Sequence, residues 1–202
     1  GDPAALAAEV TDTLLLFLLA RSGRIPLHAA GVMSGDTALV LSGPSGSGKS
    51  TLALAAAARG FQVLSDDTVF IEVGPPARVW GLPRPIHVFP ADAPSGAGAT
   101  RQRGGKLKSV VPLDAALSRR VADQAKLILL NRSDRLALTP LDTEAAVAGL
   151  SRLEPGFHLL REESEAAARA LARHGAWRLD LADDPAAAIE FISTRLSSAA
   201  PQ

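Results

Sequence analysis

A glycine-rich octet at residues 43–50, with the sequence GPSGSGKS, carries the clearest chemistry in the chain. Its glycines let the backbone bend tightly, so that successive N–H groups point inward and can bind the oxygens of a phosphate chain. A helix beginning at the end of the octet would add about half a positive charge at its N-terminus. The ammonium group of Lys49 can bridge terminal phosphates, and the hydroxyl of Ser50 can coordinate magnesium. The pattern, a P-loop, predicts a site for a nucleoside triphosphate with Mg²⁺, bound through Gly43, Ser45, Gly46, Ser47, Gly48, Lys49, Ser50 and Thr51.

Two adjacent aspartates, Asp66 and Asp67, form the second feature. Short apolar strands are expected at residues 38–41, directly before the P-loop, and at 61–65, directly before the aspartates. A strand, a helix and a parallel strand form a right-handed crossover in nearly all cases, so both strands should end at the same edge of the sheet. Two carboxylates would then lie beside the phosphates, where one can hold magnesium and the other can accept a proton from an attacking hydroxyl. The alternative is a solvated turn.

The elements that must position these residues follow from hydrophobic pattern and from glycine and proline. Alanine and leucine, strong helix formers, fill residues 51–59. Other helices are expected at residues 3–21, 143–153 and 162–173 and from Asp183-Asp184 onward, and other strands at 26–32, 68–73, 109–113, 126–130 and 177–181. The strand at 109–113 should lie at a sheet edge because of Pro112. This order predicts an α/β fold, a single domain over residues 1–202 with an N-terminal helix within 1–25 and a mixed sheet of about six to eight strands.

Residues 91–105 lack large apolar side chains and are rich in glycine, alanine and serine. Such a segment buries little surface, so we expect a mobile loop. Four basic residues lie in it or just after it: Arg101, Arg103, Lys106 and Lys108. The loop could close over a nucleotide or an acceptor and neutralise phosphate charge, and the alternative is a solvated linker.

Composition excludes several classes of protein. Lys and Arg together number 21, as do Asp and Glu, a balance that favours neither a nucleic-acid partner nor a membrane surface. The absence of cysteine excludes disulfides and thiolate metal sites and fits the cytoplasm. The apolar run at residues 13–20 is shorter than the roughly 20 residues that span a bilayer. Acidic residues precede it, which is not typical of a signal peptide, so we expect a buried helix.

The P-loop, Ala53-Leu54, Arg59-Gly60 and Asp66-Asp67 together resemble the HPr kinase/phosphorylase family. The pattern is most similar to the short serine kinases associated with lasso-peptide and other peptide-modification pathways. His28 matches a family histidine on the strand before the P-loop strand, and residues 79–87 (VWGLPRPIH) resemble a proline-rich segment of the relatives. The match is specific over residues 27–67 and loose from there to about residue 150.

The resemblance implies an ATP- and Mg²⁺-dependent serine kinase for proteins or peptides, on a phosphoenolpyruvate-carboxykinase-like fold. That fold matches the C-terminal domain of HPr kinase, a mixed sheet with flanking helices. Asp66 would be the catalytic base, Asp67 would join Ser50 at the metal, and His28 would approach the phosphates beside Lys49. No Leu-Glu-Ile-Arg-Gly segment is present, so the phosphorylase reaction does not carry over. The family's large N-terminal domain has no counterpart here, and homo-oligomerisation stays open.

Other candidates are weaker. His28, without the resemblance, would be an ordinary strand histidine, and Arg84 between two prolines could present its guanidinium to the site. Three histidines share no metal-ligand spacing, and surface or core roles are expected for His87, His158 and His174. Trp80 and Trp177 are expected to pack.

These observations favour a kinase that transfers the γ-phosphate of ATP to a serine or similar hydroxyl of a peptide or small protein. Two alternatives remain. One is a nucleotide-binding sensor or assembly module with little catalysis, and the other is a small-molecule kinase. The double aspartate and the absence of an ABC-transporter signature such as LSGGQ favour the kinase.

Overall fold

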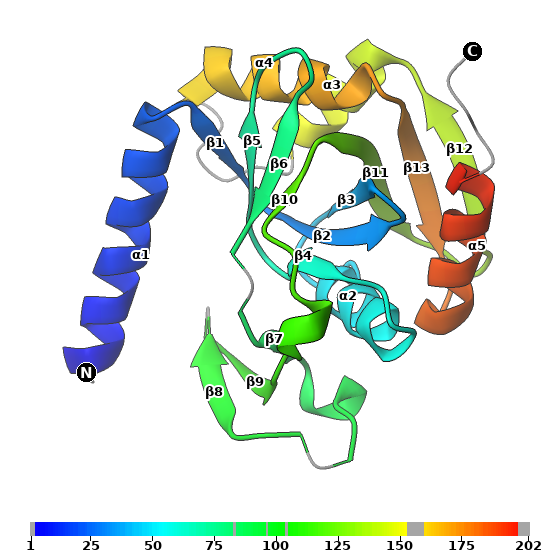
Figure 1. Ribbon diagram of the computed structural model, residues 1–202. Coiled ribbons are helices and arrows are strands. Elements are labelled where there is room, and N and C mark those ends of the chain that lie inside the picture. Colours follow the sequence, from blue (N-terminus) through cyan, green and yellow to red (C-terminus); the bar gives the residue numbers. More distant parts are fainter. Residues whose placement is uncertain (1–2, 83, 96, 104, 153–159, 198–202) are drawn as a thin grey trace.

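The computed structural model describes residues 3–82, 84–95, 97–103, 105–152 and 160–197 of the chain (Figure 1). Its central element is a six-stranded mixed sheet in the order β12-β13-β11-β3-β2-β4. These strands are β2 (Ala29–Ser34), β3 (Thr37–Ser42), β4 (Val63–Ser65), β11 (Gln124–Arg132), β12 (Ala137–Leu141) and β13 (Ala176–Leu181). The strands β3, β11 and β13 are parallel to one another, and the remaining pairings are antiparallel. The expected mixed α/β architecture is confirmed.

Helices cover both faces of this sheet, because side chains along its central strands alternate between two apolar clusters. Leu39 and Leu41 of β3 face α2 (Lys49–Ala58) and α5 (Pro185–Ser197). Val40, between them, belongs to the cluster with α3 (Thr143–Ser151) and α4 (Arg161–Ala172). Leu127 and Ile128 of β11 divide in the same way and are fully buried. The result is a three-layer core that holds the carboxyl ends of the parallel strands in place.

Two smaller sheets flank the central one. The first has the order β1-β5-β6-β10, with β1 (Arg24–Leu27), β5 (Val69–Glu72), β6 (Arg78–Gly81) and β10 (Val121–Ala122). The second has the order β7-β9-β8, with β7 (Ile86–Val88), β8 (Thr100–Arg103) and β9 (Lys106–Val111). Two short 3₁₀ helices, η1 (Pro90–Asp92) and η2 (Ala115–Leu117), lie in the connections.

The structure corrects several expected elements. The single strand expected at residues 26–32 is divided at His28 into β1 and β2, which belong to different sheets. The strand expected at an edge is β9, which is central in its sheet, because it ends at Val111 and leaves Pro112 outside the ladder. Within residues 91–105, the structure forms the end of η1 and all of β8, which pairs with β9 through backbone hydrogen bonds that need no apolar side chains.

The N-terminal helix α1 (Pro3–Arg21) has the expected length, but the expectation that its apolar run is buried is wrong. The side chains of Leu14, Phe17 and Leu18 are each more than half exposed. The reason is visible in Figure 1, where α1 stands apart from the body and meets it only near its C-terminal end, beside β1. Within the described residues, no helix combines the length and apolarity needed to cross a membrane.

Candidate functional site: a P-loop cavity between two sheets

The P-loop lies between β3 and α2, at the carboxyl edge of the central sheet. Gly46 and Gly48 have φ angles of 86° and 107°, in the left-handed region that glycine adopts without strain. A β-carbon at Gly48 would also lie 2.9 Å from Leu181 Cδ2, so a side chain there would disturb the packing of β13. The loop therefore has a curvature that only glycine supports. It places the N-terminus of α2 at the side of the cavity that is described below.

Lys49, at the start of α2, folds back over the loop. Its ammonium group donates hydrogen bonds to the carbonyl oxygens of Gly43 and Pro44, at 2.6 and 3.2 Å. Gly43 itself leaves no room for a side chain, since a β-carbon there would lie 2.6 Å from the Ser47 hydroxyl. Gly43 and Ser47 are absent from the lining of the cavity, whereas Ser45, Gly46, Gly48, Lys49, Ser50 and Thr51 line it. Gly43 and Ser47 thus shape the P-loop from behind.

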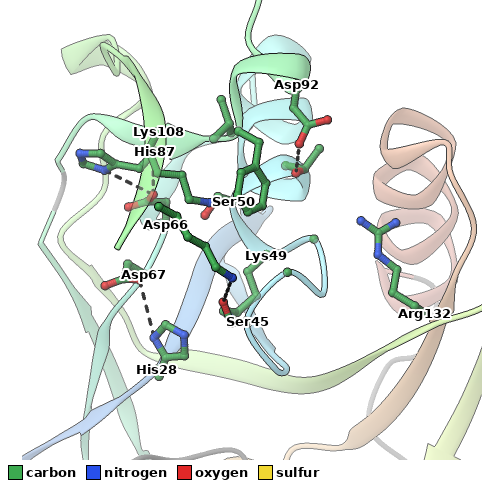
Figure 2. A pocket seen from close by; sticks show the side chains of 16 residues that line it. His28, Ser45, Lys49, Ser50, Asp66, Asp67, His87, Asp92, Lys108 and Arg132 are labelled. Atoms are coloured by element: carbon green, nitrogen blue, oxygen red, sulfur yellow. Dashed lines mark hydrogen bonds and ion pairs between the residues drawn. The ribbon is translucent and has the colours of Figure 1, made fainter. Parts of the chain in front are cut away.

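The cavity has a volume of about 400 Å³ and lies between two walls, each of which contributes residues to its lining (Figure 2). The first wall is the P-loop with the ends of β4 and β11. The second wall is the β7-β9-β8 sheet, which packs on α2 through the buried residues Ile86 and Val88 of β7. The cavity is lined by His28, Ser45, Gly46, Gly48, Lys49, Ser50, Thr51, Asp66, Asp67, His87, Val88, Phe89, Asp92, Lys106, Lys108 and Arg132.

Both aspartates follow β4 and reach this cavity. The strands β3 and β4 run in the same direction because β2 lies between them and is antiparallel to both. The prediction that the P-loop and the aspartates share one sheet edge is confirmed, although the two strands are not neighbours. Asp66 and Asp67 lie in the bend after β4, and their side chains meet different partners.

Asp66 is almost fully buried. Its Oδ2 accepts a hydrogen bond from the backbone N–H of His87 at 2.9 Å, and Nδ1 of the same histidine lies 3.8 Å away. The expectation of a surface or core role for His87 is therefore wrong, because β7 brings this residue to the cavity wall. The contact spans 21 positions and two sheets, so no local pattern in the sequence signals it.

Asp67 is about one third exposed, and its Oδ1 lies 3.6 Å from Nδ1 of His28. The Ser65 hydroxyl accepts hydrogen bonds from the backbone N–H groups of Asp67 and Thr68, at 3.4 and 3.3 Å, which fixes the turn after β4. His28 comes from the break between β1 and β2. Figure 2 shows the two pairs, Asp66 with His87 and Asp67 with His28, on the same side of the P-loop.

The hairpin of β8 and β9 carries lysines into the cavity. The Lys106 ammonium lies 3.4 Å from the Ser45 hydroxyl, and the Lys108 ammonium lies 3.6 Å from the centre of the Phe89 ring. Burial, followed by repulsion from Lys106, lowers the pKa of Lys108. The carboxylates of Asp66, Asp92 and Asp67 act in the opposite direction. This wall is therefore positively charged and faces acidic groups.

Arg132 and Asp92 complete the lining. Arg132 is the last residue of β11 and lies across the P-loop from the aspartates (Figure 2), and its guanidinium is 3.7 Å from Asp183. Asp92 Oδ2 lies 3.5 Å from the Thr51 hydroxyl. Sequence reasoning missed both residues, because neither belongs to a motif.

The remaining candidates lie elsewhere. Arg84 is exposed and does not line the cavity, and His174 is exposed as well. The side chain of Arg103 and all of His158 lie outside the described part of the structure. Trp80 packs as expected, with the Arg24 guanidinium 4.5 Å above its ring.

The described residues contain no group of three or more histidine, aspartate or glutamate side chains that could hold a metal ion by themselves. The oxygens at hand for a cation in the cavity are the Ser50 hydroxyl and the two carboxylates. Few protein ligands of this kind are typical of Mg²⁺, which keeps waters and shares oxygens with substrate phosphates. The donor set thus fits a nucleotide-bound magnesium ion.

No family model matches this chain, and no curated protein matches it. Among solved structures, the chain is similar to the Hpr(Ser) kinase/phosphatase from Coxiella burnetii. The two are 12% identical, with a TM-score of 0.46, over 85% of this chain and 93% of that chain.

Proposed function

We propose that the protein is a kinase that transfers the γ-phosphate of ATP to a serine or other hydroxyl of a peptide or small protein. One observation carries the proposal. The P-loop and two differently partnered aspartates line the same cavity of about 400 Å³. Binding a triphosphate requires only the P-loop. Transfer of its γ-phosphate to a hydroxyl also requires a carboxylate near the transferred group.

The P-loop amides, the N-terminus of α2 and the Lys49 ammonium bind the phosphate chain in this account. Lys49 contacts loop carbonyls in the structure, and it exchanges those contacts for phosphate oxygens when nucleotide is present. Ser50 and Asp67 would hold Mg²⁺, which would neutralise charge on the phosphate chain. The exposure of Asp67 supports this role, since a partly hydrated carboxylate can accept a hydrated ion.

Asp66 is the general base in this proposal. Burial limits its contact with water, and the N–H of His87 fixes one oxygen at 2.9 Å. The other oxygen is left to accept the proton of the acceptor hydroxyl. A fixed carboxylate within reach of the γ-phosphate orients the nucleophile before transfer, which lowers the entropic part of the barrier. His28 supports the carboxylate of Asp67 or a phosphate oxygen.

The experiment uses a library of serine-containing peptides incubated with the wild-type protein, ATP and Mg²⁺. Mass spectrometry should detect peptides heavier by one phosphoryl group, with the phosphate on a hydroxyl side chain. A parallel reaction with Lys49→Ala, and one without Mg²⁺, serve as controls and should give no product. Tight nucleotide binding with no phosphorylated peptide or small molecule would contradict the kinase and favour a nucleotide-binding module.

A further inference from the structure

We infer that Lys108 is a catalytic residue that contacts the transferred phosphoryl group, while Lys106 holds the phosphates before transfer. This inference rests on the proposed function and goes further, because it assigns the chemistry of the second wall. Neither lysine belongs to the P-loop motif, and both come from β9.

The backbone of β9 directs both lysines to one side. Side chains alternate along a strand, so Lys106 and Lys108 share a face and Leu107 between them points the other way. Leu107 is 54% exposed, whereas Lys106 and Lys108 line the cavity. Lys106 reaches Ser45 at the start of the P-loop turn. Lys108 lies nearer to Phe89 and, of the carboxylates, is most affected by Asp66. The two ammonium groups therefore address different ends of the terminal phosphates.

The surroundings of Lys108 suit an anion that is absent from the free protein. Within the described residues, its ammonium makes no hydrogen bond and no ion pair, and it rests on the Phe89 ring. A partly desolvated ammonium beside a second lysine is unfavourable, as its lowered pKa reflects. A phosphoryl group would relieve this repulsion and supply the missing acceptor oxygens. The Phe89 ring fixes the side chain in advance, so little reorganisation is needed during transfer.

The transfer step needs only ATP, the acceptor hydroxyl and the Asp66 carboxylate as reactants. The acceptor oxygen forms a bond to the γ-phosphorus while the bond from that phosphorus to the β,γ-bridging oxygen breaks. The hydroxyl proton moves to Asp66, and ADP keeps the electron pair of the broken bond. Lys108 keeps its proton throughout and contacts the equatorial oxygens, over which the charge of the transferred group is spread in the transition state.

The test compares the affinity for Mg-ADP with the affinity for Mg-ADP-aluminium fluoride, which mimics the phosphoryl group in transfer. In Lys108→Met, which keeps the apolar stem on Phe89, affinity for the fluoride complex should fall by about a hundredfold. Its affinity for Mg-ADP should change by less than about threefold, as for a contact made only in the transition state. Lys106→Met should weaken both complexes by the same factor. The matched control is Gln102→Ala on β8, which lies opposite the exposed Leu107 in register and outside the cavity lining, and it should change neither affinity.

Lys108→Arg adds a check on charge, because it keeps a cation and should retain most of the affinity for the fluoride complex. Wild-type affinities for both complexes in Lys108→Met would overturn the role of Lys108 and leave the nucleotide site standing. Equal weakening of both complexes would also overturn it, because Lys108 would then be a ground-state contact. A wild-type protein that does not bind Mg-ADP would instead overturn the proposed function.

Discussion

The two walls of the cavity are built in different ways. The P-loop wall stands on β3 and β11, whose side chains are buried between helices on both faces of the central sheet. The β7-β9-β8 wall is a three-stranded sheet anchored to α2 through β7, and its outer hairpin is largely exposed. The first wall has a rigid support, and the second has few apolar contacts beyond β7. We interpret the first as a fixed cradle for phosphates and the second as the carrier of the cations that act during transfer.

Core truncation should distinguish the walls most strongly. Leu127→Ala removes a fully buried side chain from β11 and should lower the free energy of unfolding by about 2–5 kcal/mol. Leu107→Ala, in the exposed hairpin, should lower it by less than about 0.5 kcal/mol. Chemical denaturation of both variants measures the difference. Similar losses would mean that the hairpin is as much a part of the core as β11.

Nucleotide should stabilise the protein through the first wall. At a ligand concentration a hundredfold above the dissociation constant, Mg-ATP should raise the free energy of unfolding by about 2.7 kcal/mol. Lys49→Ala should remove most of this gain, and Gln102→Ala on the second wall should preserve it. Thermal melts with and without nucleotide provide the readout. Melts that no triphosphate shifts would argue against the P-loop site.

Hydrogen exchange should separate the walls in the free protein and bring them closer in the complex. Amides of β8 and the β8–β9 turn should exchange fast without ligand, since little apolar surface protects them. With Mg-ATP and a peptide acceptor, closure of the hairpin should slow them by on the order of tenfold, and those of β3 should change little. Equal protection in both states would make the hairpin a structural element with no closing role.

The smallest expected effect is on the pH dependence of activity. Because the pKa of Lys108 is lowered, its ammonium loses a proton at lower pH than an ordinary lysine does. The charges that face it are Lys106, Asp66, Asp92 and Asp67. Activity should be full below the pKa of Lys108 and fall as pH rises through it, on the alkaline limb of kcat/KM, which reports the free enzyme. Lys108→Arg keeps its charge and should move this limb to higher pH. If the alkaline limb of Lys108→Arg stays at the wild-type pH, the limb reports the titration of another group.

The sequence predicted the first wall because its determinants are local. The octet, the alanine-rich helix and the aspartates after an apolar strand lie within residues 38–67, and a helix that crosses back over the sheet between two strands brings the ends of both strands to one edge. Most helices and strands of the central core were predicted for the same reason, since their apolar periodicity is strong.

The second wall could not be predicted in this way. The strand β8 has no apolar signal, and its pairing with β9 depends on backbone hydrogen bonds. His87 reaches Asp66 only after β7 packs on α2, a contact between distant segments. The expectation that α1 is buried failed for a different reason. An apolar sequence favours burial but does not specify which part of the protein covers it.

The division of labour between the two aspartates tests the account most directly. Single-turnover transfer of the γ-phosphate should be measured across a range of Mg²⁺ concentrations, with an unphosphorylated library peptide that the wild-type protein phosphorylates as acceptor. Asp66→Asn should bind Mg-ATP nearly as well as the wild type and transfer phosphate at least about a hundredfold more slowly at every Mg²⁺ concentration. The Asp67→Asn variant should need a higher Mg²⁺ concentration and should recover part of its transfer rate when that concentration is raised. An Asp66→Asn variant that transfers phosphate at the wild-type rate would contradict the assignment of Asp66 as the base.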